Sequence, residues 1–481
     1  MTIDTKIKKT LISQADNYNG NFGEVLRSSA IFWVKNNSVM STTISFLNYW
    51  QYKNVTEVSV FINSRELTGQ LLSRRRVSFE KGAVFNYQPP ENFEGSVEVE
   101  VFSIKNMRIP YAAIMAVYET KYSISMVHSY TRVYSQHEIE EGRTIMDGQE
   151  SCWTLRDTNL MTSFAVIHNG AIAQPHQDIT ISVRNWTGKK LSKQIELKSL
   201  SPFETMIVEP KKYFDDLIDF LEGKPGNASF SFKLNGAFTR MLCGIKSTDE
   251  KQLQVTHSNF DYSIHDTDKI TKGILKAYMR TPNVNSDLVK QEILVYPDTH
   301  PGHYVVEYEN KVDSFSTGEI YQLPFDTHEE RSLIFSRTDD ILPTRIVTAL
   351  RLNTDDSIIP AECSLGVVHH ARPKKHFHWM LVSKKFNSQI SWVDFKEVYG
   401  GCPEDAEFVF KLYSPENLKE IVMKFLKSDL PKNNTIYLSD FLATHDISSD
   451  YCYLTLWCSY GGLELFSTLE KLKSITIEHA F

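Results

Sequence analysis

Apolar and polar residues alternate along most of the chain in short runs, with the period of a half-buried β-strand. Residues 97–101 read Val-Glu-Val-Glu-Val, and residues 178–183 read Asp-Ile-Thr-Ile-Ser-Val. Gly, Pro, Asn and Asp bound these runs, as they do in turns between antiparallel strands. The pattern therefore predicts an all-β fold of tandem antiparallel β-sandwiches, Ig-like or jelly-roll-like, with few short helices.

Two segments have helical rather than alternating periodicity. In residues 212–222 the apolar positions are Tyr213, Phe214, Leu217, Ile218 and Leu221. In residues 415–427, which begin with a proline, they are Leu418, Ile421, Val422 and Phe425. Both stripes predict short helices whose apolar face packs into a sandwich core.

The order of strands and turns repeats along the chain at about 110 to 130 residues, the size of a domain. Residues 57–62 and 178–183 are each followed by a polar turn and a further apolar strand, and residues 319–325 resemble residues 435–441. These repeats predict about four sandwich domains. The expected organisation is an N-terminal arm at 1–40, β-sandwich repeats at 41–135, 161–270, 271–384 and 385–481, and a connecting segment at 136–160.

Each predicted repeat ends in a strand-like segment that carries a histidine. These histidines, which are 129, 112 and 110 residues apart, are His128, His257, His369 and His479. One interpretation is that each ring pins a strand end through a hydrogen bond to the backbone. In another, an arginine of the preceding strand and the histidine together bind a carboxylate, sulfate or phosphate of an acidic glycan or anionic peptide. The candidate ligand-binding residues are then Arg108, His128, Arg240, His257, Arg351 and His369.

Four histidines also lie close together in sequence, at His369, His370, His376 and His378. Alternate strand residues point the same way, so His370, His376 and His378 are candidate metal ligands. Three cationic side chains among them oppose a bound cation, and a structural zinc needs four protein ligands. The favoured interpretation is a solvated crossing between strands without a cofactor, with a metal or an anion-binding edge as alternatives.

Composition narrows the classes of partner. The formal charge is -7 and the pI is near 6.1, whereas nucleic-acid binding needs clustered cations, so no nucleic-acid partner is expected. No apolar run reaches the roughly 18 to 20 residues of a transmembrane segment, and no secretory signal is recognised. We expect a cytoplasmic protein by default, with non-classical release as the alternative. The six cysteines form no CxxC pair and are expected to be reduced and buried.

Two features suggest surfaces for binding. The aromatic block at residues 46–52 places alternating rings on one strand face, where they either fill a core or stack on sugar rings. Arg74, Arg75 and Arg76 end a predicted strand and are expected to prevent wrong strand pairing at a sheet edge.

Local signatures of catalysis are absent from the sequence: it has no GxSxG, no HExxH and no glycine-rich phosphate loop. We expect a non-catalytic scaffold or recognition protein that acts through sandwich faces and edges, glycan-associated or part of an assembly, with a protein or a second copy as partner. Two alternatives stay open. One is an enzyme acting on a glycan or anionic metabolite at an interdomain site, because paired carboxylates leave no local motif. The other is a self-assembling surface or particle subunit.

Overall fold

The structure of the protein is a computed structural model in which most of the chain is described. The described residues are 27–49, 58–79, 83–103, 113–128, 132–134, 152–231, 238, 241–259, 274–284, 286, 289–297, 300, 302–325, 330–354, 358–417, 419–439, 447–472 and 474–480. Regular structure in them is nearly all β-strand, with few short helices. The predicted all-β fold class is confirmed.

The described strands form eight antiparallel sheets, which pair into four units of two sheets each. Unit 1 contains β1 (Arg27–Asn36), β2 (Met40–Leu47), β3 (Val58–Glu66), β4 (Leu71–Arg76), β5 (Val84–Tyr87), β6 (Phe93–Ser103), β7 (Ala113–Thr120), β8 (Ile124–His128) and β9 (Arg132–Tyr134). Unit 2 contains β10 (Cys152–Leu155), β11 (Met161–His168), β12 (Gln177–Arg184), β13 (Lys190–Leu197), β14 (Thr205–Val208), β15 (Gly226–Ser231), β16 (Leu242–Ser247) and β17 (Leu253–His257).

The second half of the chain forms two further units of eight strands. Unit 3 contains β18 (Ala277–Thr281), β19 (Val289–Val295), β20 (His303–Tyr308), β21 (Lys311–Ser316), β22 (Tyr321–Phe325), β23 (Arg331–Arg337), β24 (Thr348–Thr354) and β25 (Ala361–Leu365). Unit 4 contains β26 (Phe377–Ser383), β27 (Asn387–Asp394), β28 (Glu407–Tyr413), β29 (Ile421–Leu426), β30 (Thr435–Tyr437), β31 (Tyr451–Cys458), β32 (Leu463–Lys471) and β33 (Ser474–His479).

All four units share one strand order. One sheet contains the fourth, third, sixth and first strands, as in β13-β12-β15-β10, and the other contains the fifth, second, seventh and eighth, as in β14-β11-β16-β17. Unit 1 adds β9 beside β1. The turn between β3 and β4 in unit 1 resembles the turn between β12 and β13 in unit 2. Gly69 and Gly188 in these turns have φ angles of 87° and 82°, which glycine adopts without a steric penalty. The predicted fourfold repetition is therefore present in the topology.

Each unit has its own apolar core between its two sheets. In unit 2, Trp153 and Ile181 from one sheet pack in one cluster with Ala165 and Ile167 from the other. The alternation of the sequence accounts for this packing, because every second residue of a strand points into the core. All six cysteines are buried and form no disulfide, as predicted.

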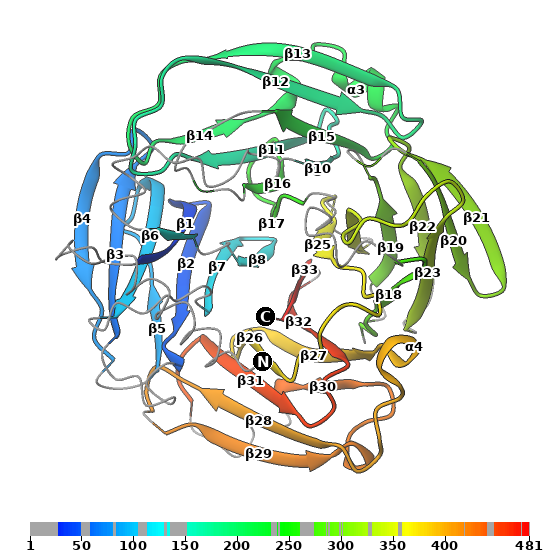
Figure 1. Ribbon diagram of the computed structural model, residues 1–481. Coiled ribbons are helices and arrows are strands. Elements are labelled where there is room, and N and C mark those ends of the chain that lie inside the picture. The colour runs from blue at the N-terminus through cyan, green and yellow to red at the C-terminus, as the bar shows by residue number, and fades with distance from the viewer. Residues whose placement is uncertain are drawn as a thin grey trace, which may run out of the picture.

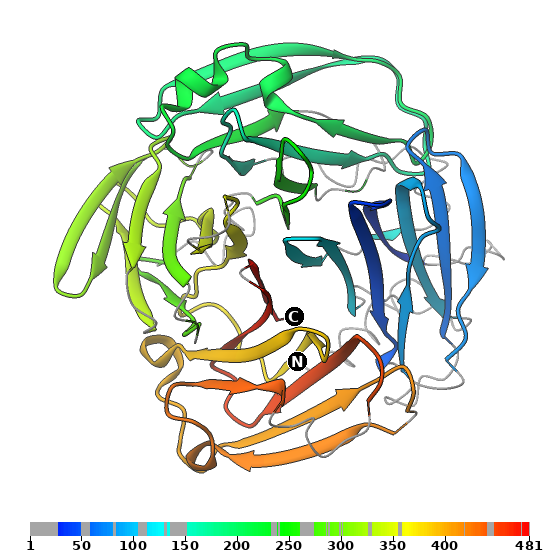
Figure 2. The same ribbon diagram turned by 180° about the vertical axis from the view of Figure 1, so that it is seen from behind.

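The four units follow one another around a common axis and form a closed ring (Figures 1 and 2). The fourth strand of each unit, β4, β13, β21 or β29, lies at the rim, and the eighth strand, β8, β17, β25 or β33, lies at the axis (Figure 1). Neighbouring units also pack sheet against sheet: Trp33 of unit 1 and Phe164 of unit 2 have ring centroids 5.7 Å apart. The eight sheets thus surround the axis as propeller blades do, although each consecutive pair of sheets forms one sandwich.

The first and last units meet directly and close the ring. Tyr453 Oη of β31 donates to Ser45 O of β2 over 2.8 Å. Lys385 Nζ lies 3.0 Å from Glu119 Oε2, and Tyr451 Oη donates to Glu119 Oε1 over 2.6 Å. Unit 4 is therefore joined to unit 1 by buried hydrogen bonds as well as by apolar contacts.

Side chains at the axis form hydrogen bonds with backbone groups on the strand edges that face it. Each eighth strand has one edge paired with the seventh strand of its own sheet, while the other edge faces its neighbours. Ser125 Oγ of β8 accepts a hydrogen bond from Val255 N of β17 (2.8 Å) and donates one to Val255 O (3.0 Å). In the same way, Thr476 Oγ1 of β33 accepts from Met126 N of β8 (3.1 Å). Hydroxyl side chains of one unit thus complete the backbone hydrogen bonding of the next.

The helices in the described residues are short, and one of the two predicted helices is wrong. α3 (Leu217–Leu221), with the 3-10 turn η2 (Pro210–Lys212) before it, lies in the predicted region at 212–222. The region of the predicted helix at 415–427 instead contains β29, followed by the 3-10 turn η4 (Lys427–Asp429). Every residue of β29 pairs with β28, and this pairing fixes the segment as a strand. The other α-helix in the described residues, α4 (Lys396–Tyr399), is a single turn. Within the described chain, no helix has the length and apolar character needed to cross a bilayer.

Strands pair across two of the predicted domain boundaries, near residues 40 and 384. The boundaries themselves stay predictions. β1 pairs with β6 of unit 1 although it falls within the predicted arm at 1–40. β26 pairs with β31 of unit 4 although it falls within the predicted repeat at 271–384. Most of the predicted connecting segment at 136–160 lies outside the described residues.

The hydroxyl contacts at the axis predict a stability loss that can be measured. Ser125→Ala removes both bonds to Val255 and leaves a buried amide without its partner, so the free energy of unfolding should fall by about 1 to 3 kcal/mol. Urea denaturation measures the change. The exposed Ser73 of rim strand β4 is the control, and Ser73→Ala should change stability by less than about 0.5 kcal/mol. Equal effects of the two substitutions would contradict the role given to Ser125.

Candidate functional site at the ring axis

Three of the four eighth strands end at one point on the axis. His128 ends β8, His257 ends β17, and Glu478 and His479 end β33. These residues come from units 1, 2 and 4, and the two histidines of units 1 and 2 are among the predicted ligand-binding residues. The axis cluster, as we call these four residues, is the one group of three or more possible metal ligands found in the described part of the chain.

The side chains of the axis cluster are close enough to act on one ligand. One ligand atom from each of the four lies within 4.8 Å of the others. Glu478 Oε1 is 3.3 Å from His128 Nδ1 and 3.6 Å from His479 Nε2. The rings of His128 and His257 have centroids 4.5 Å apart. All except His479 are buried.

Backbone contacts orient two members of the axis cluster. His257 Nδ1 is 2.8 Å from Ser258 O, and because a carbonyl only accepts, this nitrogen carries the proton. The lone pair of the neutral ring is then on Nε2. Glu478 Oε1 accepts a hydrogen bond from His479 N over 3.1 Å. Such outer contacts fix ring tautomers and carboxylate positions in metal sites.

Unit 3 supplies a different residue at this position. The position compared is the last residue of the eighth strand that pairs with the seventh strand. In unit 1 this residue is His128, opposite Met115, and in unit 2 it is His257, opposite Leu242. In unit 3 it is Leu365, opposite Thr348. His369 lies four residues further on and is not in the axis cluster. Burial, with the charges of Arg372 and His370, lowers the pKa of His369 to about 4, so this ring is neutral near pH 7.

Cys363 of unit 3 reaches the axis cluster from β25. Its Sγ is 3.9 Å from Glu478 Oε1. Burial and the nearby charge of Glu478 raise the pKa of the Cys363 thiol, so that the thiol stays protonated. Unit 3 therefore contributes a neutral group beside the four possible ligands.

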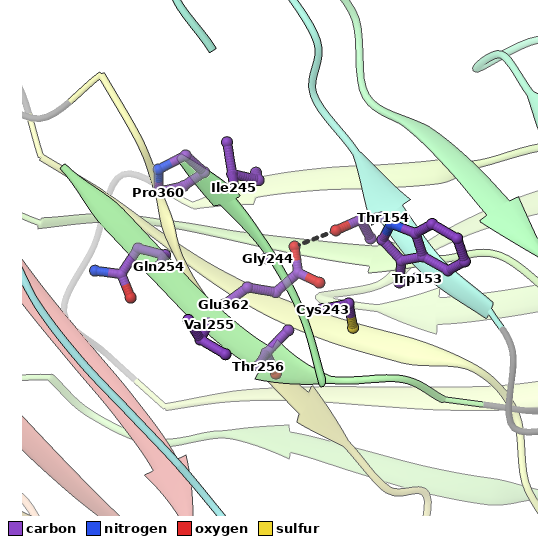
Figure 3. A pocket seen from close by; sticks show the side chains of 10 residues that line it. All are labelled: Trp153, Thr154, Cys243, Gly244, Ile245, Gln254, Val255, Thr256, Pro360 and Glu362. Atoms are coloured by element: carbon purple, nitrogen blue, oxygen red, sulfur yellow. Dashed lines mark hydrogen bonds between the residues drawn. The ribbon is translucent and has the colours of Figure 1, made fainter. Parts of the chain in front are cut away.

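Among the predicted arginines, Arg351 lies in the described residues, and it is not part of this cluster. Arg108 and Arg240 lie outside the described residues. Arg351 is fully buried, and its Nε donates to Glu362 Oε2 over 2.9 Å. Glu362 Oε2 also accepts from Thr154 Oγ1 of unit 2 over 2.5 Å, as Figure 3 shows. Arg351 thus takes part in a buried polar contact between units 2 and 3.

A small cavity adjoins this polar contact (Figure 3). It has a volume of about 10 Å³ and is lined by Thr154, Glu362 and residues of β16 and β17. This volume matches roughly one water molecule, and a sulfate or a sugar would not fit. We therefore interpret the Arg351–Glu362 pair as structural.

The candidate metal ligands in the histidine-rich segment are dispersed. His370 is exposed, and His376 Nδ1 donates to Cys458 O over 2.9 Å. His378 is buried, and burial together with the charge of Lys375 lowers its pKa well below the ordinary value. In the residues that the structure describes, these three histidines form no group with the spacing of metal ligands.

A second candidate site lies where unit 4 meets unit 1. A pocket of about 320 Å³ is lined by Tyr49, Phe377, Val409, Lys411, Tyr413, Thr455 and Trp457. Six of these come from alternate positions of β26, β28 and β31, so they share the sheet face that points away from the core of unit 4. The ring of Tyr49, from unit 1, has its centroid 6.3 Å from that of Phe377.

The aromatic block predicted at 46–52 divides between core and surface. Phe46 is buried in the core of unit 1, and Tyr49 lines the pocket. The end of the block, from Trp50 to Tyr52, lies outside the described residues. The pocket could not be found from the sequence, because its other lining residues come from three strands that the chain brings together only on folding.

No protein-family model matches the chain, and no curated protein is significantly similar to it.

The buried pair at the boundary of units 2 and 3 gives a prediction. Arg351→Met should lower the free energy of unfolding by about 3 to 5 kcal/mol, because it leaves the carboxylate of Glu362 buried without its cation. Glu362→Gln should also destabilise, and the double variant should lose clearly less than the sum of the two. Urea denaturation of all four proteins forms the double-mutant cycle. Additive effects would show that the two side chains are not coupled.

Proposed function

We propose that the protein is a non-catalytic recognition scaffold that binds a neutral glycan in the aromatic pocket between units 4 and 1. The observation that carries this proposal is the pocket of about 320 Å³ with four aromatic side chains on its lining. Its volume is at the lower end of the roughly 300 to 1,000 Å³ typical of small-molecule sites. One or two sugar rings match that space.

The aromatic side chains suit the apolar face of a sugar ring. Trp457 is 42% exposed and projects from β31 next to Phe377, its partner in the strand register. A flat exposed indole gains by covering C–H groups of a pyranose, since both surfaces leave water. Tyr49 and Tyr413 add two further aromatic rings to the lining.

The polar residues of the lining favour a neutral ligand. Lys411 Nζ donates to Glu420 Oε1 over 3.1 Å, so its charge is already balanced. An ammonium has three N–H donors, so Lys411 can also donate to a sugar hydroxyl. Thr455, its partner in the strand register, supplies a hydroxyl at the floor of the pocket. A sulfated or carboxylated glycan would have to compete with Glu420 for Lys411.

The closed ring supports the scaffold part of the proposal. The pocket contains residues of unit 1 and unit 4, and the buried hydrogen bonds between these units hold its walls in place. A preformed site avoids part of the entropy loss of binding. Binding is favoured over hydrolysis because the described lining of the pocket includes no carboxylic acid that could act as acid, base or nucleophile.

Self-assembly through sheet edges is the weaker alternative. The rim strand β4 carries Arg74, Arg75 and Arg76, all exposed, and β13, β21 and β29 each carry at least one lysine. Charged side chains on edge strands oppose pairing with another chain. The rim therefore resists the edge-to-edge contacts that a filament or shell would need.

Isothermal titration calorimetry with hexamers of β-1,4-linked glucose, N-acetylglucosamine and xylose tests the proposal. At least one neutral oligomer should bind, and Trp457→Ala should weaken it about tenfold or more, equal to roughly 1.4 kcal/mol. The control is Trp186→Ala, because Trp186 is similarly exposed (38%) but lies on unit 2. The proposal fails if no neutral oligomer binds, if only acidic glycans bind, or if both variants bind like the unmodified protein.

A further inference from the structure

We infer that the axis cluster binds one divalent transition-metal ion of the zinc class, which joins units 1, 2 and 4 at the centre of the ring. The site is independent of the aromatic pocket and of the glycan proposal. Its ligands are His128, His257, Glu478 and His479.

The donor set has the composition of a zinc site. Three imidazoles and one carboxylate provide four N and O ligands, the number that a structural zinc ion takes. Calcium and magnesium prefer oxygen ligands, so three nitrogen donors select against them. Because all four positions are filled by protein, the ion would have no open position for substrate, and its role would be structural.

The spacing requires only a small contraction. Ligand atoms about 2.0 to 2.1 Å from a tetrahedral zinc ion lie roughly 3.3 Å from one another. Two of the contacts, 3.3 Å from Glu478 to His128 and 3.6 Å from Glu478 to His479, are already near that value. The whole set lies within 4.8 Å, so movement of side chains alone can bring the remaining atoms into range.

The surroundings stabilise a bound cation. Glu478 and His128 are buried, and a carboxylate in such a place needs positive charge nearby. Either a bound cation or a protonated histidine can supply it. The hydrogen bond from His257 Nδ1 to Ser258 O orients the ring, and in the neutral ring it leaves the lone pair of Nε2 for a cation.

The position of the ion would explain what it does. His128 and His479 lie in the first and last units, so an ion between them links two strands that are far apart in sequence. Cross-links of this kind stabilise most when the chain between their ends is long. The ion would therefore act at the place where the ring closes, beside the hydroxyl contacts of β33 with β8.

Metal analysis of protein made without a histidine tag is the first test. After treatment with a chelator and dialysis, the protein should bind one equivalent of Zn²⁺, and Co²⁺ should give the visible absorption of tetrahedral coordination. Saturating Zn²⁺ should raise the melting temperature by about 2 to 3 °C. Failure to bind stoichiometric metal, or binding without any shift in melting temperature, would overturn the proposal.

Two variants locate the site. His257→Gln should abolish stoichiometric Zn²⁺ binding and the shift in melting temperature. His369→Gln is the control, because His369 is also buried and lies four residues beyond the end of the eighth strand β25, but it is outside the axis cluster. Retention of binding in the first variant, or its loss in the second, would refute this location. If His257→Gln does not fold, the Co²⁺ spectrum of the unmodified protein still decides whether the site exists.

Both variants should retain glycan binding if they fold, and Trp457→Ala should retain zinc. Failure of one proposal is therefore distinguishable from failure of the other.

Discussion

The ring arrangement of this protein depends on hydrogen-bond partners for the backbone groups at the inner edges of its sheets. Every eighth strand has backbone N–H and C=O groups on the edge that faces the axis, and buried groups of this kind need partners. Ser125 and Thr476 provide them for β17 and β8, and Gln254 Nε2 donates to both Ile124 O and Ile475 O (2.9 and 3.0 Å). An open row of four sandwiches would leave the edge of β8 exposed. The ring is the arrangement that buries and satisfies it.

Both candidate sites follow from this closure. The axis cluster exists because the ends of β8, β17 and β33 meet, and each strand alone contributes only one or two of its residues. The aromatic pocket exists because unit 4 is brought against Tyr49 of unit 1. In both places, residues from the beginning and the end of the chain are combined, so an open chain would have neither site.

Much of the local structure could be predicted from the sequence. Alternation predicts strands because strand side chains point to opposite faces, and the turns at Gly69 and Gly188 mark corresponding hairpins. The helix predicted at 415–427 failed because its spacing of apolar residues also fits a strand whose alternate residues are half buried, and pairing with β28 decided between the two. Long-range pairing of this kind leaves no mark on the local pattern.

The sites were less predictable than the strands. A histidine near the end of each repeat pointed toward the axis cluster, but a shift of four residues places Leu365 rather than His369 at the corresponding position of unit 3. Glu478 carried no signal of its own, because an acidic residue on a strand is usually solvated. Ring closure was not predicted, since the pattern of one repeat does not depend on whether the fourth repeat contacts the first.

Amide hydrogen exchange tests most directly whether the axis closes the ring. The amides of Ile124, Met126, Leu253 and Val255 donate to hydroxyls of a neighbouring unit and should exchange only by global unfolding, as the slowest of the molecule. Amides of the rim strands β4 and β29 that face away from their paired neighbour should exchange much faster. If the amides of Ile124 and Met126, which donate to hydroxyls of unit 4, exchanged as fast as those of the rim, the ring would open readily in solution, and the contacts at the axis would not be what holds it closed.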